Sequence, residues 1–306
     1  MNDAILVLGA SGFIGRHLAE SFAAAGNMVI AATRHATTFT HPGITNVVSP
    51  FDLPEHFTPL LSRCRWVIHA ASTSTPGSSA ADPLVEVDML RPTLALLCAL
   101  QNASTHCHLL YLSSGGTLYG DRAGANAQEH DPLMPRSYHG AGKAAAECFI
   151  RAWAEQYEGT AVVLRPSNVF GPGQQPRAGF GIIPAAFERA LDGEAITIWG
   201  DGSVVRDYLH VDDLVALCHA IVAKQAEGMH VFNASSGTGI GVTGLLDVID
   251  ALTGRPLQRV YAPGRVVDIQ KILPDNAAAR AAFGWQPQIN LHDGLQQTWR
   301  WFTTHR

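Results

Sequence analysis

Near its N-terminus the chain places three glycines between an apolar run and an amphipathic run. "AILVLGA" (4–10) is typical of a buried strand, and "GFIGRHLAESFAAAG" (12–26) is typical of a helix that ends at a glycine. Gly9, Gly12 and Gly15 lie where the strand passes into the helix. Glycine there permits a tight turn and lets a pyrophosphate approach the free N–H groups of the helix. An ordinary glycine-rich turn is the alternative, but the flanking strand and helix favour dinucleotide binding.

Short apolar runs alternate with longer amphipathic runs through the first half of the chain. We expect further strands at 28–33, 46–49, 66–71, 107–114 and 160–171, with helices at about 80–101 and 138–157. Strands that alternate with helices, and that are apolar along their length, form parallel sheets covered on both faces. The sequence therefore predicts an α/β fold.

The pattern changes after Gly171. A loop-rich segment is followed by an expected helix at 182–192 and by short β segments, and "MHVFNAS" (229–235) indicates one more core strand. No linker, repeat or low-complexity segment separates the two halves. We therefore expect the halves to interleave.

Composition argues against several classes of partner. The 306 residues carry a net charge of −5 without a basic stripe, which argues against nucleic acid or an anionic membrane surface. No apolar run approaches the roughly 20 residues of a membrane span, and the N-terminus lacks the charged region of a signal peptide. The five cysteines form no C-x-x-C pair and the 14 histidines lack ligand spacing. We expect reduced thiols in a cytoplasmic protein and no metal site.

Six motifs follow one another along the chain. They are the G-x-x-G-x-x-G loop, "VIHAAS", "SSGGTLYG", Lys143 with "KAAAE", "RPSNVFGPG" and "RDYLHVDDL". In this order they resemble the extended short-chain dehydrogenase/reductase family, from about residue 4 to about residue 290. Its best-known members are nucleotide-sugar 4-epimerases and 4,6-dehydratases.

The resemblance implies a Rossmann-type doubly wound parallel sheet with a smaller, interleaved C-terminal substrate domain. Residues 1–171 with about 229–235 then bind the dinucleotide, and residues 172–228 and 236–306 bind a nucleotide-diphosphate sugar. The resemblance also implies a homodimer whose interface is a four-helix bundle from the helices near 80–101 and 138–157. "PLVEVDMLRPTLALLCAL" has enough apolar residues for such an interface, although a helix buried within one chain has the same composition.

The residues after the second strand bear on which dinucleotide binds. A carboxylate there accepts hydrogen bonds from the ribose of NAD, whereas an arginine pairs with the 2′-phosphate of NADP. This chain has Thr33 and Arg34 with no acid nearby, which favours NADP over NAD unless Arg34 is an ordinary solvated residue. Asp52 resembles the family aspartate that contacts adenine, and it also suits the N-cap of a helix at 54–63. By resemblance the other cofactor contacts are Gly9, Ser11, Gly12, Phe13, Ile14, Gly15, Ala70, Ala71, Lys143 and Pro166.

Three segments in the second half resemble those that hold the substrate in this family. Asn168 and Arg206 are at the positions that reach the diphosphate, and Arg265 and Asp268 have the R-x-x-D spacing in which the arginine clamps phosphate and the aspartate binds the nucleotide ribose. A guanidinium suits this task because its planar fork meets phosphate oxygens in a bidentate manner. A surface salt bridge is the alternative for any one arginine.

The stretch "SYHGAGK" departs from the family pattern, in which a tyrosine lies four residues before the lysine. Here His139 has that spacing from Lys143, and Tyr138 lies five residues before it. Four positions return to nearly the same helix face, whereas five land about 140° away. The resemblance implies that Lys143 holds the nicotinamide ribose, and a neighbouring ammonium should depress the pKa of His139.

A second departure concerns the hydroxyl of the motif "SSGGTLYG". Gly115 stands where the family has serine or threonine, and Ser114 and Thr117 flank it as substitutes. Three interpretations of the reacting centre stay open. His139 is the acid/base, or Tyr138 reaches the site because the helix starts late, or the site is altered and the protein binds its ligands without turnover.

We predict a nucleotide-sugar epimerase or 4-ketoreductase that acts by hydride transfer between a sugar carbon and a nicotinamide. A nonredox nucleotide-sugar or dinucleotide-binding protein is the alternative.

Overall fold

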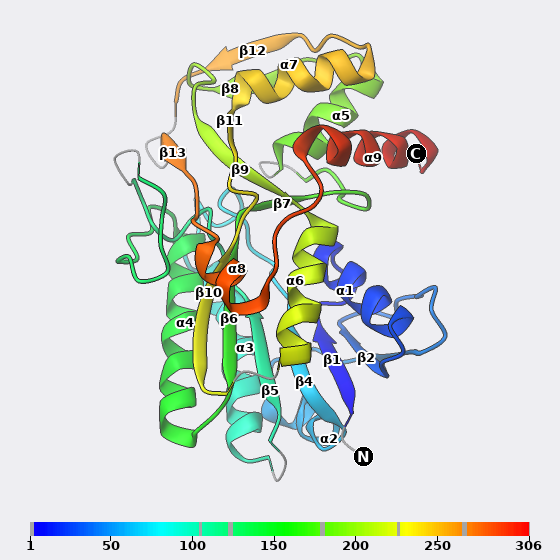
Figure 1. The fold of residues 1–306 in the computed structure, drawn as a ribbon, viewed down its shortest axis with the longest axis vertical. Coiled ribbons are helices and arrows are strands. Elements are labelled where there is room, and N and C mark those ends of the chain that lie inside the picture. The colour runs from blue at the N-terminus through cyan, green and yellow to red at the C-terminus, as the bar shows by residue number, and fades with distance from the viewer. Residues whose placement is uncertain are drawn as a thin grey trace.

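The computed structural model describes residues 3–103, 106–121, 125–177, 181–224, 227–264 and 268–305. Its centre is a seven-stranded parallel sheet with the strand order β10-β6-β5-β4-β1-β2-β3 (Figure 1). The strands are β1 (Ala4–Leu8), β2 (Val29–Thr33), β3 (Ile44–Val48), β4 (Cys64–His69), β5 (His108–Leu112), β6 (Ala161–Pro166) and β10 (Met229–Ala234). The chain order reverses between β1 and β4, and ligands bind at such a switch point, outside the carboxyl ends of the strands.

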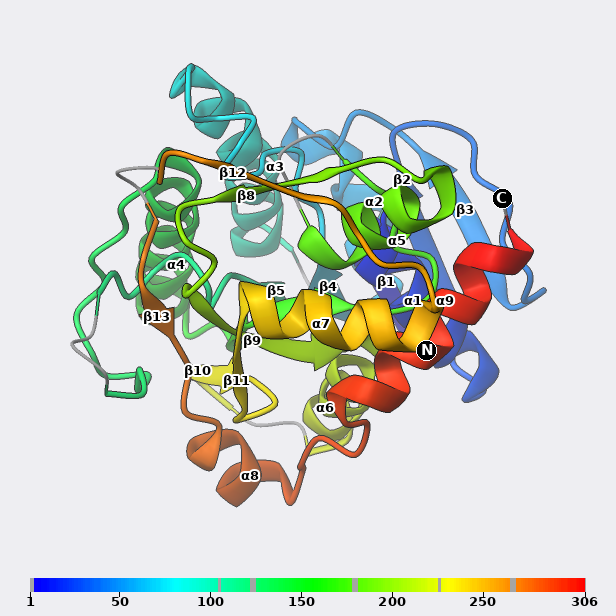
Figure 2. The ribbon, with the colours of Figure 1, turned by 90° about the horizontal axis from the view of Figure 1, so that it is seen from above.

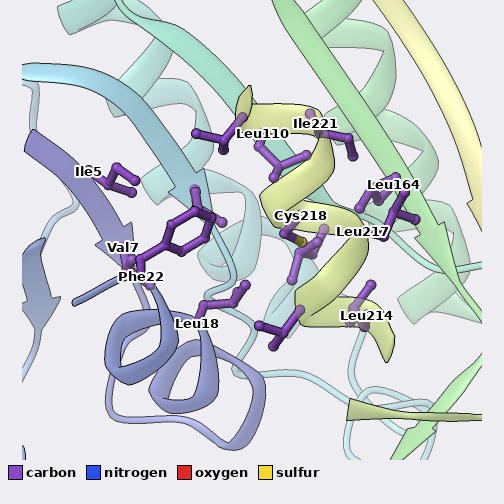
Figure 3. Close-up of a cluster of buried hydrophobic side chains, with 14 of the residues drawn as sticks. Ile5, Val7, Leu18, Phe22, Leu110, Leu164, Leu214, Leu217, Cys218 and Ile221 are labelled. Carbon is purple, nitrogen blue, oxygen red and sulfur yellow. The ribbon is translucent and has the colours of Figure 1, made fainter. Parts of the chain in front are cut away.

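Helices cover both faces of this sheet because successive strand residues point to opposite sides. Ile5 and Val7 pack with Leu18 and Phe22 of α1 (Phe13–Ala24) and with α6 (Val211–Lys224), as Figure 3 shows. Leu6 lies in the second cluster, beneath α3 (Leu84–Gln101) and α4 (Tyr138–Tyr157). This is the predicted doubly wound α/β class. Within the described residues, no helix combines the length and apolarity needed to cross a membrane.

Apart from α8 (Ala277–Phe283), the remaining elements lie beyond the carboxyl ends of the sheet, toward the top of Figure 1 and nearest the viewer in Figure 2. One small sheet contains β7 (Asn168–Phe170), β9 (Val205–His210), β11 (Gly239–Gly241) and β13 (Lys271–Ile272), and β8 (Ile196–Trp199) pairs with β12 (Arg259–Ala262). The helices α5 (Ile182–Asp192), α7 (Val242–Thr253) and α9 (Leu291–Thr304) share a third cluster. The small sheets with α5, α7 and α9 therefore lie above the carboxyl ends of the central sheet, whereas α8 packs at its β10 edge.

The structure differs from two of the expected elements. The strand expected at 160–171 is divided, because β6 ends at Pro166 and β7 leaves the central sheet to pair with β9. Proline has no N–H to continue the ladder. The helix expected at 54–63 is a 3₁₀ turn, η1 (Pro54–His56), followed by the short helix α2 (Thr58–Leu61).

Candidate active site

The glycine loop has two positions, Gly9 and Gly15, that admit no side chain. Gly9 has a φ of +86°, and a Cβ on it would lie 2.6 Å from the Cα of Ala71. A Cβ on Gly15 would collide with the carbonyl oxygen of Gly9. Gly12 is the N-cap of α1 and offers no capping side chain, so the first-turn N–H groups face the loop without an internal partner. This geometry fits the pyrophosphate of a dinucleotide.

The end of β2 presents no acidic side chain to a ribose. The hydroxyl of Thr33 is held inside the turn: it donates to the carbonyl oxygen of His35 at 2.8 Å and accepts from the amide of Asn46 at 2.8 Å. Arg34 follows at the surface and forms no ion pair within the described part of the chain. The Thr33 hydroxyl is therefore already hydrogen bonded within the turn, whereas the exposed side chain of Arg34 is accessible to a ligand.

Asp52 does not cap a helix, so that part of the prediction is wrong. The 3₁₀ turn begins after Leu53, which is its N-cap, and the Asp52 carboxylate lies 3.3 Å from Nδ1 of His56. The residue before it, Phe51, is buried and has a φ of +55°. Asp52 is half-buried beyond β3, and its expected contact with adenine stays a prediction.

The helix α4 begins with a regular, capped first turn. The Ser137 side chain accepts a hydrogen bond from the N–H of Gly140, and Tyr138 is the first helical residue. The late, irregular start that would carry Tyr138 to the face of Lys143 is therefore absent. The side chain of Tyr138 is 49% exposed, whereas His139 is only 8% exposed.

His139 is enclosed by groups from three parts of the chain. Its Nδ1 lies 2.9 Å from the hydroxyl of Ser74 and 3.9 Å from a carboxylate oxygen of Glu86. Nε2 makes no hydrogen bond to the residues that the structure describes. Burial, and then the charge of Lys143, lower the pKa of His139 to about 4. The like-charge effect was expected, but burial is the larger cause. The imidazole is thus neutral at pH 7.

Lys143 is tied to the carboxyl end of β5. Its Nζ donates to the carbonyl oxygen of Leu112 at 2.9 Å and lies 4.9 Å from the centre of the Tyr111 ring. Burial lowers the pKa of Lys143 to about 8, although the charges of Glu86 and Glu147 oppose the shift. The ammonium is therefore held in place at the end of the sheet where the glycine loop also lies.

The hydroxyls of Ser114 and Thr117 form a pair beside this site. Thr117 Oγ1 donates to Ser114 Oγ at 2.9 Å, and both residues are half-buried. Gly115 has no room for the serine or threonine of the family pattern, since a Cβ there would lie 2.8 Å from the carbonyl oxygen of Arg165 and 2.9 Å from Pro274. The loop therefore offers its hydroxyls from the flanking positions.

Asn168 lies close to this hydroxyl loop. A Cβ on Gly116 would be 3.8 Å from the Asn168 side-chain oxygen, and the Asn168 amide donates to the carbonyl oxygen of Asp207 at 2.9 Å. Asn168 is also paired in register with Tyr208 on β9, the strand that carries Arg206. The structure thus brings Asn168 and β9 to the carboxyl end of the sheet.

The other two expected substrate residues are Asp268 and Arg265. Asp268 is half-buried, and its carbonyl oxygen accepts a hydrogen bond from Arg136 at 3.5 Å. Arg265 lies outside the described residues.

A profile of the "NAD dependent epimerase/dehydratase family" matches residues 5–235. The chain belongs to this family. The UDP-glucose 4-epimerase of Mycolicibacterium smegmatis is 30% identical, with 97% of each chain covered. The UDP-glucose 4-epimerase of Thermotoga maritima, solved with UDP-glucose, has a TM-score of 0.91 and 29% identity over 98% of each chain. That of Thermus thermophilus, solved with NAD, has a TM-score of 0.91 and 28% identity, covering 99% of this chain and 100% of its own.

These similarities confirm the predicted family, the fold class and the assignment to epimerase and reductase enzymes. They also confirm a nicotinamide dinucleotide as the cofactor of this chain.

One buried network beside this site was not foreseen. Arg165 forms an ion pair with Glu147 at 2.6 Å and donates to the hydroxyl of Tyr119 at 2.8 Å. Tyr119 in turn donates to Asn233 on β10, and Ser113 donates to Glu147. The network joins α4, β6 and β10, and it holds Glu147 within the electrostatic reach of Lys143. Sequence patterns carry little signal for it, because its members are far apart in the chain.

Proposed function

We propose that this chain is a nucleotide-sugar 4-epimerase in which His139 transfers the proton. The observation that supports this best is the placement of His139, which is buried on the same face of α4 as Lys143. Its Nδ1 is hydrogen bonded, and its Nε2 makes no hydrogen bond to the described residues. When bound, a nicotinamide would supply the hydride chemistry at the sugar carbon. In the oxidation of the sugar alcohol to a ketone, the hydroxyl O–H bond would break and the Nε2 lone pair of His139 would take the proton. When the ketone is reduced from its other face, His139 would return this proton to the oxygen, and the carbon would be inverted.

Neighbouring residues support this role. A neutral imidazole, with its pKa lowered to about 4 by burial and by Lys143, accepts a proton at pH 7 without first losing one. We propose that Lys143 binds the nicotinamide ribose, and that Ser114 or Thr117 donates a hydrogen bond to the reacting sugar oxygen. Their half-buried hydroxyls and the tie from Lys143 to β5 support both assignments.

We also propose that NADP(H) binds more tightly than NAD(H). Exposed Arg34 follows directly on β2, and the hydroxyl of Thr33 is already used in the turn. A reduced NADP pool would suit a 4-ketoreductase, which needs net reduction and uses the same residues. The ketoreductase is therefore the second candidate function.

The substrate is proposed to be a nucleotide-diphosphate sugar held by Asn168, Arg206, Arg265 and Asp268. In this proposal residues 1–171 with about 229–235 bind the dinucleotide, and residues 172–228 with 236–306 bind the substrate. The position of β10 in the central sheet, and of β7 and β9 above its carboxyl ends, supports the division.

We propose a homodimer through α3 and α4, which pack against each other. Leu84 and Val87 of α3 and Phe149 of α4 are exposed apolar side chains on these helices. Burying them against a second copy would make a four-helix bundle. Sedimentation of the wild type and of Val87→Glu tests this: a monomer in both cases contradicts it.

The function is tested by turnover. The purified protein is incubated with UDP-, GDP-, dTDP- and CDP-sugars and each dinucleotide, and products are separated by chromatography. Interconversion of 4-epimers without net cofactor consumption is expected. Stoichiometric oxidation of the reduced cofactor identifies a 4-ketoreductase. Binding of nucleotide sugars without turnover supports the nonredox alternative. Mass spectrometry of copurifying nucleotides identifies the base and sugar class.

A further inference from the structure

Two side chains that the reaction scheme above does not use meet the ring of His139. Ser74 comes from the loop after β4 and Glu86 from the first turn of α3, and both are buried. The Ser74 hydroxyl lies 3.1 Å from Glu86 Oε2 and 2.9 Å from His139 Nδ1. The three groups therefore form a hydrogen-bonded chain that runs from a carboxylate through a hydroxyl to the imidazole.

Counting protons in this chain favours one state of the ring when Glu86 is a carboxylate. An ionised carboxylate only accepts hydrogen bonds, so the single hydroxyl proton of Ser74 is donated to Glu86. The Ser74 oxygen can then face Nδ1 favourably only by accepting, which requires the proton of the neutral imidazole to be on Nδ1. Nε2 consequently carries the lone pair.

The packing of α3 on α4 makes room for this carboxylate. A Cβ on Gly142 would lie 2.5 Å from Glu86 Oε2 and 3.2 Å from Glu86 Cβ. Glycine is unfavourable in the interior of a helix, and Gly142 is in the second turn of α4, one residue before Lys143. The missing side chain at Gly142 is what allows Glu86 to reach the His139 ring.

The second carboxylate oxygen of Glu86 lies close to the His139 ring, which becomes positively charged when it takes a proton. Oε1 is buried, lacks a hydrogen-bond partner among the described residues, and is 3.9 Å from His139 Nδ1. When Nε2 takes a proton, the ring becomes an imidazolium beside this oxygen. A negative charge at that distance opposes the repulsion from Lys143, which is on the same face of α4.

We propose that Ser74 and Glu86 are positioning residues for His139: they hold it in the Nδ1–H tautomer and stabilise its protonated form. This inference rests on the proposed role of His139 as acid/base. It adds two residues that act through the ring and do not touch the sugar. The charged groups facing the ring are Glu86 from α3 and Lys143 from α4, with Glu147, Tyr111 and His69 behind Lys143.

The tautomer is measured without turnover. In protein labelled with ¹⁵N-histidine, the signals of His139 are assigned by their loss in His139→Gln. The wild type should show a protonated Nδ1 and an unprotonated Nε2 at pH 7. Ser74→Ala should shift the ring toward Nε2–H, whereas Thr73→Val, which removes an exposed hydroxyl of the same loop, should not. A wild-type ring already protonated on Nε2 would overturn the proposal.

The charge is tested with Glu86→Gln, which keeps the shape of the side chain. Removing the negative charge should lower the pKa of His139 further in the same NMR titration and reduce kcat by about 10²-fold or more, with KM little changed. Glu155→Gln removes the same charge from an exposed site on α4 and should change neither quantity. Melting temperatures verify that each variant is folded.

The two proposals fail in different ways. If the tautomer and the Glu86-dependent pKa are observed but no nucleotide sugar is turned over, the positioning chain is supported and the proposed activity is not. If His139→Gln abolishes turnover but Glu86→Gln changes neither the pKa nor kcat, then His139 is the acid/base and the positioning role of Glu86 is wrong.

Discussion

Nζ of Lys143 donates a hydrogen bond to the carbonyl oxygen of Leu112 at 2.9 Å, which fastens α4 to the carboxyl end of β5. The ammonium is buried there, and burial lowers its pKa to about 8 from an ordinary value of 10.5. Its charge is therefore nearly complete well below pH 8 and is lost as the pH rises through about 8. Any ligand contact that depends on this charge must weaken over the same range.

The first prediction is that dinucleotide binding weakens as the pH rises through about 8. In Lys143→Met this pH dependence should disappear, and the Kd at pH 7 should rise roughly 10- to 100-fold, as for a lost charge-assisted hydrogen bond. Lys224→Met is the control, since Lys224 also donates to a backbone carbonyl but is exposed on α6. Fluorescence titration measures both. An unchanged Kd in Lys143→Met would remove Lys143 from the cofactor site.

The second prediction separates the two neighbours at the start of α4. His139→Gln should lower kcat by about 10²–10⁴-fold with little effect on KM, because a general acid/base is lost. Tyr138→Phe should keep nearly full activity, because its ring points to solvent from the capped first turn. Steady-state kinetics with the nucleotide sugar that the turnover assay identifies decide between them. An inactive Tyr138→Phe with an active His139→Gln would reverse the assignment.

The third prediction follows from the burial of His139. Its pKa is lowered from 6.5 to about 4 in the folded protein, so between these values the unfolded chain binds more protons than the folded one. Stability should therefore fall as the pH drops from 6.5 toward 4, by roughly 3 kcal/mol from this residue.

His69 is buried and has a lowered pKa in the same range, so the wild-type profile alone does not isolate His139. The difference in urea unfolding between wild type and His139→Gln is measured at pH 7 and at pH 4.5. The stability of the wild type should decline more on acidification. Equal declines would show that the folded protein tolerates a charged His139.

The sequence predicted the parts of this fold that depend on local pattern. The range expected for α4 is the range observed, since the Ser137 cap and the apolar period of 138–157 are local signals. The range of α5 is also as expected. The break in the expected strand 160–171 was missed, because only the pairing of β7 with β9 shows that the chain leaves the sheet at Pro166.

In the candidate site, too, features set by local spacing were predictable and contacts between distant segments were not. Spacing alone placed His139 rather than Tyr138 on the face of Lys143. The contact between Ser74 and His139 spans 65 residues, and nothing in a single sequence indicates that a loop serine and Glu86 will meet across α3 and α4. The glycine at position 142, inside a helix, is the one local sign of this contact. It can be interpreted only when the residue that packs against it is known.

The fourth prediction concerns the substrate half. Arg206→Ala and Arg265→Ala should each weaken nucleotide-sugar binding roughly 10- to 100-fold, because each removes a charged donor from a diphosphate. Dinucleotide binding should not change, because neither arginine is among the proposed cofactor contacts, and Arg206 is at the start of β9, a strand outside the central sheet. Calorimetry with both ligands measures this, and Arg300→Ala on the exposed side of α9 is the control. Loss of cofactor binding alone would contradict the substrate assignment.

The last prediction is the preference for NADP(H). Arg34 is exposed directly after β2, and the described part of the chain gives it no acidic partner, so its guanidinium is available to a 2′-phosphate. Arg34→Ala should cost about 1.5–3 kcal/mol of NADP(H) binding and leave NAD(H) binding nearly unchanged. Arg63→Ala is the matched control, because Arg63 is exposed at the amino end of β4, far from the switch point. Both dinucleotides are titrated into the wild type and into each variant. Each comparison of the wild type with a variant then rests on four affinities, two for NADP(H) and two for NAD(H). Equal or tighter binding of NAD(H) by the wild type would contradict the preference, and Arg34 would then be a solvated residue of the turn that Thr33 and Asn46 hold.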